Sequence, residues 1–315
     1  MERRYPSDRS VQPNVTRPRI RSTSGAQSAD RRAVLREITH SSGPVVLTSD
    51  LLSKAGFAHA FSTRVGGVSA PPFNAMNLQS VQANARIAEG EPRDTEANIR
   101  ENHARFAEAA GLARDAVVVD VSQVHGCTVV AARDAARERV PADAITSARG
   151  GHAILIRIAD CVPVLLACPR TGAVAAVHAG WRGVVAGIVP AAIDALRSLG
   201  CAPNELLAAI GPSISVRHFE IGPEVAEELT RANLGACVAA PGVHAMGIHA
   251  TAGREPKHHA DLVLGVRLQL ERAGVEPANI DAEPPCTYAD RARFHSFRRD
   301  GAQSGRLAAL IAPLA

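Results

Sequence analysis

Short, dense runs of apolar residues alternate along the chain with longer segments in which apolar positions recur at helical spacing. The most apolar region, 153–168, is broken only by Arg157 and Asp160 among charged residues. Runs of this length and density predict buried strands. We predict strands at 57–63, 117–121, 128–132, 153–158, 162–168, 173–177, 206–210, 293–297 and 307–311, with 128–132 continuing the strand 117–121.

Apolar spacing of three or four residues predicts helices at 94–110, 184–199, 223–231 and 260–273. Gly111 and Gly200 follow the first two of these and mark their ends. Strands and helices are interspersed without an internal repeat or a clear linker. The pattern therefore predicts a mixed α/β (α+β) fold: one domain over residues 44–315, with mixed β-sheets flanked by helices. Residues 235–258 lack periodicity, and we predict a surface excursion there.

Residues 1–43 differ in composition from the rest of the chain, because Arg, Ser, Pro and Gln dominate them. Such a segment cannot bury enough apolar surface to fold, so it is predicted to be a disordered tail. It holds nine Arg against four acidic residues, which leaves 26 basic and 27 acidic residues for the remainder. The predicted domain is thus near neutral, and its charge does not favour nucleic-acid binding.

Composition also bears on where the protein resides. No stretch reaches the roughly 18 uninterrupted apolar residues of a membrane span, and the tail lacks the apolar core of a signal peptide. The six cysteines are scattered, with no C-x-x-C pair. A cytoplasmic protein without membrane insertion is therefore expected. The oligomeric state is not indicated.

Three predicted strands end in rare polar residues followed closely by glycine or proline. The segments are Ser122-Gln-Val-His125-Gly, Ala159-Asp-Cys161-Val-Pro and His178-Ala-Gly-Trp-Arg-Gly. Imidazole and thiolate are ligands that suit zinc, and three protein ligands leave a fourth position open for catalysis. We therefore predict a zinc site at His125, Cys161 and His178. An alternative is a nucleophilic pair, Cys161 with His178, in which Asp160 or another group orients the imidazole.

These segments resemble a known family over about residues 45–315. The motifs that carry the resemblance are Phe61-Ser-Thr-Arg64-Val-Gly-Gly-Val-Ser69, Ser122–Gly126, Ala159–Val164, His178–Gly183, Ala209-Ile-Gly-Pro212 and Cys286 to Gly301. They are similar to the laccase-domain family, whose members are named multicopper polyphenol oxidases, purine nucleoside phosphorylases and, in some bacteria, peptidoglycan editing factors.

The resemblance implies a fold grouped with bacterial toxin deamidases and a zinc site at His125, Cys161 and His178. It implies phosphorolysis of adenosine, inosine and methylthioadenosine, with adenosine deamination as a further activity. Purine nucleosides and phosphate are then the expected partners. A peptidoglycan editing member would act instead as a cysteine hydrolase or amidase on a cell-wall precursor through Cys161 and His178.

Copper is the less favoured metal. None of the twelve histidines forms a His-x-His pair, which true laccases use, and no Met lies close in sequence to the candidate ligands. Copper could still occupy the site adventitiously, because it outcompetes zinc for such ligands. The usual zinc deaminase signature is also incomplete: His218-Phe-Glu220 matches its first half, but Pro285-Cys286 is followed by Ala289 in place of the second cysteine.

Phosphate binding requires fixed donors. Arg64 stands before Gly66 and Gly67, where backbone amides can approach an anion, and Arg182 is a second candidate. Arginine offers a rigid fork of donors suited to phosphate. A structural ion pair is the alternative for each arginine.

The other motif residues have weaker assignments. Asp160 is expected to orient a ligand histidine, to accept a proton or to cap the backbone. Cys286 and Arg298 are expected to complete the wall of the pocket, with packing the preferred role for Cys286. Trp181, the only tryptophan, either stacks on a base or anchors the core, and the core role is favoured.

Overall fold

The structure is a computed structural model that describes residues 35–241 and 257–315. The chain divides into two units, 1–31 and 32–315, and every described residue belongs to the second. Residues 1–34 of the predicted disordered tail lie outside the described part, as does most of 244–259, a segment of the predicted surface excursion that is rich in histidine.

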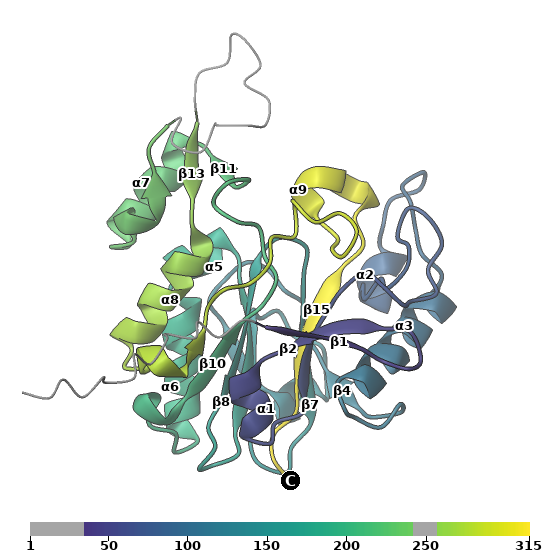
Figure 1. The fold of residues 1–315 in the computed structure, drawn as a ribbon, viewed down its shortest axis with the longest axis horizontal. Coiled ribbons are helices and arrows are strands. Elements are labelled where there is room, and N and C mark those ends of the chain that lie inside the picture. The colour runs from purple at the N-terminus through teal and green to yellow at the C-terminus, as the bar shows by residue number, and fades with distance from the viewer. Residues whose placement is uncertain (1–34, 242–256) are drawn as a thin grey trace, which may run out of the picture. The chain divides into compact units, whose positions relative to one another are not determined.

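Two six-stranded sheets carry most of the fold (Figure 1). The first has the order β1 (Arg36–Thr39), β2 (Val45–Thr48), β3 (His59–Ser62), β15 (Leu307–Ile311), β7 (Ala153–Ile158) and β4 (Val118–Val119). Its neighbours are antiparallel except for β4 with β7. The C-terminal strand β15 thus lies between strands from the first half of the chain.

The second sheet has antiparallel central strands and a parallel pair at each edge. Its order is β14 (Ile280–Asp281), β10 (Leu207–Ile210), β8 (Val162–Ala167), β9 (Val174–Ala179), β6 (Ala144–Ser147) and β5 (Val129–Ala131). A small third sheet has the order β11 (Glu220–Ile221), β13 (His258–Ala260) and β12 (Val238–Ala239).

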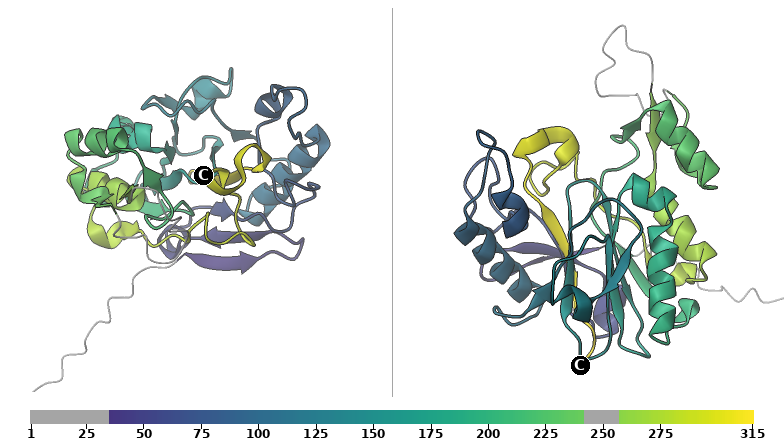
Figure 2. Two further views of the ribbon diagram at one scale, coloured as in Figure 1. Left: turned by 90° about the horizontal axis from the view of Figure 1, so that it is seen from above. Right: turned by 180° about the vertical axis from the view of Figure 1, so that it is seen from behind.

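Helix residues of 96–109 pack outside the first sheet and those of 181–198 and 262–272 pack outside the second, whereas the other helices lie at sheet ends or beside the small third sheet. The structure describes nine helices. They are α1 (Asp50–Lys54), α2 (Val81–Ala85), α3 (Glu96–Ala109), α4 (Ala132–Ala135), α5 (Trp181–Val185), α6 (Ile188–Ser198), α7 (Pro223–Arg231), α8 (Leu262–Arg272) and α9 (Phe297–Asp300). Figures 1 and 2 show α3 on one side of the strands and α6 with α8 on the other. None of the helices in the described part is long and apolar enough to cross a membrane.

Alternating side chains along the strands bind these layers together. In β7, Ile154, Ile156 and Ile158 belong to the core between the sheets, whereas Leu155 belongs to the core that also contains Phe106 of α3. In β8, the side chains of residues 162, 164 and 166 pack with helices α5, α6 and α8, and those of 165 and 167 face the first sheet. The period of two places one helical layer outside each sheet, in the order helix, sheet, sheet, helix.

The predicted mixed α/β class is confirmed, and most predicted elements are present within two or three residues of their expected ends. Four expectations are wrong in detail. Residues 36–39, assigned to the tail, form β1, which pairs with β2 in full register. Residues 128–132 do not continue the preceding strand, because β5 lies in the second sheet and β4 in the first.

The helix expected over 184–199 begins earlier and is divided in two. Gly187 has φ +83 and separates α5 from α6. A backbone in that left-handed region cannot continue an α-helix, and glycine adopts it without steric cost.

The strand expected over 293–297 is a turn that leads into α9. Ser296 caps this helix, its side chain accepting from the Arg299 amide at 3.3 Å. Phe294, His295 and Ser296 are buried, so the apolar pattern reflected burial and not strand geometry. The surface excursion expected over 235–258 includes strand residues at its two described ends, where β12 and β13 pair with each other; residues 242–256 lie outside the described part.

Candidate metal centre

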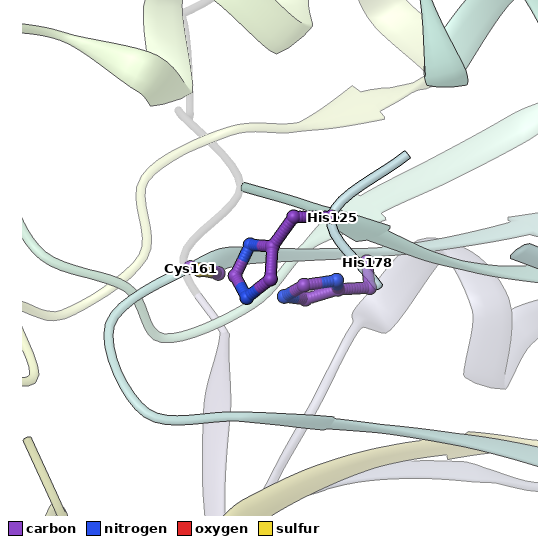
Figure 3. Close-up of side chains that lie close together, drawn as sticks. All are labelled: His125, Cys161 and His178. Atoms are coloured by element: carbon purple, nitrogen blue, oxygen red, sulfur yellow. The ribbon is translucent and has the colours of Figure 1, made fainter. Parts of the chain in front are cut away.

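The three predicted ligands come together from three separate segments. His125 lies in the loop after β4, Cys161 in the turn that joins β7 of the first sheet to β8 of the second, and His178 within β9. Their ligand atoms all lie within 4.8 Å of one another. The two imidazole rings are 4.8 Å apart between centroids and inclined at 73°. Figure 3 shows the Cys161 side chain directed toward both rings.

Strand register brings Cys161 to His178. Strands β8 and β9 are antiparallel neighbours in which Pro163 faces His178 and Val162 faces Ala179. Cys161 directly precedes β8, so it lies beside the end of β9 that carries the histidine. The residue opposite the thiol is Gly180, where an added Cβ would lie 2.7 Å from His125 Nδ1 and 3.2 Å from Cys161 Sγ. Only glycine leaves room there for both ligands.

Gln123 fixes the loop that carries His125. Its side-chain amide donates to the Arg157 carbonyl at 2.6 Å, and its amide oxygen accepts from the Arg157 N–H at 2.8 Å. These are the bonds that a neighbouring strand would make with β7. His125 itself has φ +60, an uncommon conformation for a residue with a side chain. The loop therefore holds His125 in one particular orientation.

Asp143 holds both histidines. Its Oδ1 accepts from His178 Nδ1 at 2.8 Å and from the His125 amide at 2.9 Å. Its Oδ2 accepts from the Gly126 amide at 2.6 Å and from the Val124 amide at 3.3 Å. The Asp143 side chain is fully buried. Because His178 uses Nδ1 for this bond, its Nε2 is left for the site, as in carboxylate–histidine–metal arrangements.

Asp143 was not among the site residues predicted from the sequence. A lone carboxylate at the start of the apolar segment Ala142–Ile145 was the available signal, since buried carboxylates are rare unless they have partners.

The electrostatics of the cluster favour charge separation between thiol and imidazole. Burial raises the pKa of Cys161, but His178 and His125 outweigh burial and lower it to about 6. Burial lowers the pKa of His178, but the Cys161 thiolate and the Asp143 carboxylate raise it to about 9. A thiolate is the form that binds a metal or attacks a carbon.

Asp160 caps the backbone beside the site. Its Oδ1 accepts from Thr287 Oγ1 and its Oδ2 from the Arg298 amide, both at 2.7 Å. Its main chain has φ +94, and its carbonyl accepts from the Ile214 amide at 2.9 Å. Neither side-chain bond reaches a ligand histidine, and Asp143 is the carboxylate that orients His178. The geometry thus corresponds to the capping role among those expected for Asp160.

Arg64 lines a separate cavity of about 580 Å³ together with Arg291 and Asp300. Its Nε donates to the Asn74 carbonyl at 2.7 Å and its Nη1 to the Arg291 carbonyl at 3.4 Å. The side chain is thus fixed by the backbone and not by an ion pair. No described contact joins this arginine to the three ligands.

The adjacent glycines have a packing explanation. A Cβ at Gly66 would lie 2.2 Å from the Gly43 carbonyl oxygen, and one at Gly67 would lie 2.2 Å from the Ala75 carbonyl oxygen. Close backbone packing therefore requires glycine at both positions, whether or not an anion binds there.

Arg182 and Arg298 are exposed at the ends of α5 and α9. The Arg182 guanidinium lies 4.4 Å from the centroid of Trp181. Trp181 packs against the helix-side core, in line with the favoured anchor role. Arg298 donates through Nη1 to the Glu220 carbonyl at 3.0 Å, and its own amide binds Asp160. The structure thus places the backbone of Arg298 next to the residue that precedes Cys161.

Arg306 is a second residue that the sequence analysis did not identify. Burial lowers its pKa, and the negative charges of Cys161 and Asp160 act in the opposite direction. It lines a cavity of about 190 Å³ with Asn77 and Gln79, and its guanidinium lies 5.6 Å from the exposed Phe297 ring. A cation is therefore held within electrostatic reach of the cluster.

Comparison with known proteins finds a matching family model and several relatives of similar length. A family model described as multi-copper polyphenol oxidoreductase laccase matches residues 58–313. A purine nucleoside phosphorylase of Deinococcus radiodurans is 37% identical over 253 residues, which cover 80% of this chain and 88% of that protein. A purine nucleoside phosphorylase of Pseudomonas aeruginosa is 36% identical over 266 residues, which cover 84% and 97%.

Two solved structures share the fold. YlmD from Geobacillus stearothermophilus has a TM-score of 0.71 and 26% identity, covering 90% of this chain and all of that one. Protein NMB0706 of Neisseria meningitidis has a TM-score of 0.66 and 28% identity, with coverage of 90% and 100%.

Proposed function

The chain belongs to the multi-copper polyphenol oxidoreductase laccase family, and we propose that it is a purine nucleoside phosphorylase that uses zinc at His125, Cys161 and His178. The observation that carries the proposal is the convergence of these ligand atoms to within 4.8 Å in a chain whose relatives are named purine nucleoside phosphorylases. Adenosine, inosine and methylthioadenosine are the proposed substrates, and adenosine deamination is the proposed further activity.

The three side chains fit a zinc ion. With zinc bonds of about 2.0–2.3 Å, tetrahedral ligand atoms are separated by roughly 3.3–3.8 Å. No two ligand atoms in the cluster are more than 4.8 Å apart, so small side-chain rotations would complete the site. Asp143 already fixes the tautomer of His178, and Cys161 is disposed toward the thiolate form. Bound zinc would supply a Lewis acid at the open fourth position.

Phosphorolysis needs an anion held beside a sugar that becomes cationic as the glycosidic bond breaks. Arg64 is the proposed phosphate ligand, because its guanidinium borders a cavity of about 580 Å³ together with Arg291. Arg182 and Arg298 are exposed and available as further donors. The negative charges of Cys161 and Asp160 act on the Arg306 guanidinium and favour its charged form, so this side chain is suited to counter negative charge at the cluster.

A second candidate function is a cysteine hydrolase or amidase acting on a peptidoglycan precursor. The observation that favours it is the disposition of Cys161 and His178 toward a thiolate–imidazolium pair, with Asp143 behind the imidazole. Such a pair can act as nucleophile and general base without metal. This hydrolase mechanism does not require His125.

Copper polyphenol oxidase chemistry is less well supported. A multicopper oxidase needs several metal sites. Over residues 35–241 and 257–315, the cluster at His125 is the one group of three or more potential ligands close enough to share an ion. Copper remains a possible occupant of that one site.

The test is product analysis with zinc-loaded protein. Adenosine or inosine is incubated with phosphate, and purine base, ribose 1-phosphate and inosine are separated by chromatography. We expect base and ribose 1-phosphate from the wild type and neither from His125→Ala. His152→Ala, at an exposed histidine away from the ligand set, is the matched control and should retain turnover. Absence of all three products from zinc-loaded wild type contradicts the proposal.

Metal analysis of the same preparations separates the candidates further. Zinc near one equivalent in the wild type and in His152→Ala, but not in His125→Ala, is expected. A metal-free protein that reacts at Cys161 with a thiol-directed substrate analogue, and does so equally in His125→Ala, would establish the hydrolase instead.

A further inference from the structure

A second thiol–imidazole contact lies outside the ligand cluster. Cys286 Sγ and His218 Nδ1 are 3.5 Å apart. The two residues come from distant parts of the chain, the loop after β10 and the loop after β14. Both side chains are half-buried and thus reachable from solvent. The predictions for Cys286 from sequence were a packing role or a place in the pocket wall, and neither uses its thiol chemistry.

The surroundings fix the geometry of this pair. The Ser215 amide donates to Cys286 Sγ at 3.3 Å and thereby fixes the position of the sulfur. The Ser215 hydroxyl lies 3.3 Å from His218 Nδ1. Tyr288 stacks on the His218 ring at 4.7 Å and 25°, so the imidazole cannot easily turn away. A short bridge between Ser213 and Cys286 ties the two loops together.

The imidazole is suited to accept a proton. Burial lowers the pKa of His218, and Arg217 and His259 lower it further, so the ring is neutral at pH 7. A neutral ring whose Nδ1 faces a thiol can act as its general base.

We propose that Cys286 is a modification site, at which His218 activates the thiol toward small disulfides and other soft electrophiles. The Cys286 S–H proton passes to His218 Nδ1, and the sulfur attacks one sulfur of a disulfide R–S–S–R. A new bond forms between Cys286 and that sulfur, the original S–S bond breaks, and the leaving thiolate takes the proton from His218. The disulfide is the oxidant, and the products are a mixed disulfide and a free thiol.

The position of Cys286 connects such a modification to the metal centre. The next residue, Thr287, donates to Asp160 at 2.7 Å, and Asp160 directly precedes Cys161. A group attached to Cys286 would therefore lie next to Thr287, the residue whose hydroxyl binds the Asp160 carboxylate. This proposal stands independently of the phosphorylase proposal, because it concerns a thiol that is not among the ligands.

The experiment measures the rate of iodoacetamide labelling of each cysteine in the reduced, zinc-loaded full-length protein at pH 7, by peptide mass spectrometry. Cys127 is an internal control: it is more exposed than Cys286 and makes no hydrogen bond in the described part of the chain. We expect Cys286 to be labelled faster than Cys127, by roughly tenfold, since a positioned general base contributes about 10²–10⁴-fold in enzymes and half-burial offsets part of that. His218→Ala should slow Cys286 and leave Cys127 unchanged.

Incubation with glutathione disulfide then tests the proposed chemistry, with a mixed disulfide expected at Cys286 ahead of Cys127. Wild-type Cys286 that is labelled no faster than Cys127 overturns the proposal, and this comparison does not depend on any variant folding. An unchanged Cys286 rate in His218→Ala also overturns it, because the imidazole would then have no part in the reactivity. Labelling of buried Cys168 marks an unfolded sample.

Discussion

Replacement of Asp143 by asparagine tests how the metal centre is assembled. The carboxylate accepts four hydrogen bonds, from His178 Nδ1 and from the amides of Val124, His125 and Gly126. Asparagine keeps the shape of the side chain but turns one acceptor oxygen into an NH2 group. If the remaining oxygen stays with His178 and His125, the amides of Val124 and Gly126 face a donor in a partly buried place.

The structure sets the expected magnitudes for Asp143→Asn. A buried donor left without an acceptor costs about 1–3 kcal/mol. The bonds from Val124 and Gly126 are only partly buried, so about 1–2 kcal/mol applies to each amide, and the free energy of unfolding should fall by about 2–4 kcal/mol. Loss of a carboxylate behind a ligand histidine typically lowers metal affinity about 10–100-fold. That range corresponds to about 1.4–2.8 kcal/mol of binding free energy.

Zinc affinity is measured by competition with a chromogenic chelator, and stability by urea unfolding of the metal-free protein. Asp94→Asn is the matched control. Asp94 is also a buried carboxylate with four donors, which are Ser69, Asn77, Thr95 and Asn98, and it touches none of the metal ligands. We expect both variants to lose stability and only Asp143→Asn to lose zinc affinity. Zinc affinity within about threefold of the wild type in Asp143→Asn refutes the orienting role.

Three further predictions concern a glycine beside the ligands, a buried histidine and the N-terminal residues. Gly180→Ala should weaken zinc binding at least about tenfold, since its Cβ would lie 2.7 Å from His125 Nδ1; Gly235→Ala, whose nearest neighbour is 3.6 Å away, should leave the chelator titration unchanged. Burial lowers the pKa of His295 to about 3, so this residue takes up a proton near pH 6.5 only when the chain is unfolded. Its contribution to the free energy of unfolding is therefore complete above pH 6.5 and falls by about 1.4 kcal/mol per pH unit toward pH 3. Urea unfolding at a series of pH values should show that the free energy of unfolding falls less steeply with pH in His295→Gln than in the wild type. An equally steep fall in both proteins would contradict this. Deletion of residues 1–34 should preserve turnover and melting temperature, and a fall in either would show that these residues contribute to folding or to the site.

The sequence predicted the layers and the ligand set because both depend on local patterns. The apolar runs of β7, β8 and β9 are buried on both faces, and Cys161 and His178 occur at or next to the ends of these strands. His125 follows β4 in a loop. The strand β1 was not predicted, since Arg36–Thr39 is exposed along its length and gains its order from backbone pairing with β2.

Asp143 and Arg306 could not be assigned from the sequence for a different reason. Each acts on residues far away along the chain, Asp143 on His178 and Arg306 on Cys161. Their roles follow from the pairing of β6 with β9 and from the return of β15 to the middle of the first sheet. Such long-range pairings leave no periodic trace in the sequence.

His125 bears most directly on whether Cys161 is a metal ligand or a nucleophile. His178, with Asp143 behind it, would serve either chemistry, because a hydrolase also needs an oriented imidazole. A thiol–imidazole pair has no use for a second histidine beside the sulfur. Yet the chain holds His125 there with φ +60, a conformation that costs on the order of 1 kcal/mol or more. It also uses two loop amides on Asp143 and the pairing of Gln123 with β7 to maintain it. A role of His125 as the third metal ligand explains why the fold maintains this conformation despite its cost. The geometry therefore favours metal binding at Cys161 over nucleophilic attack.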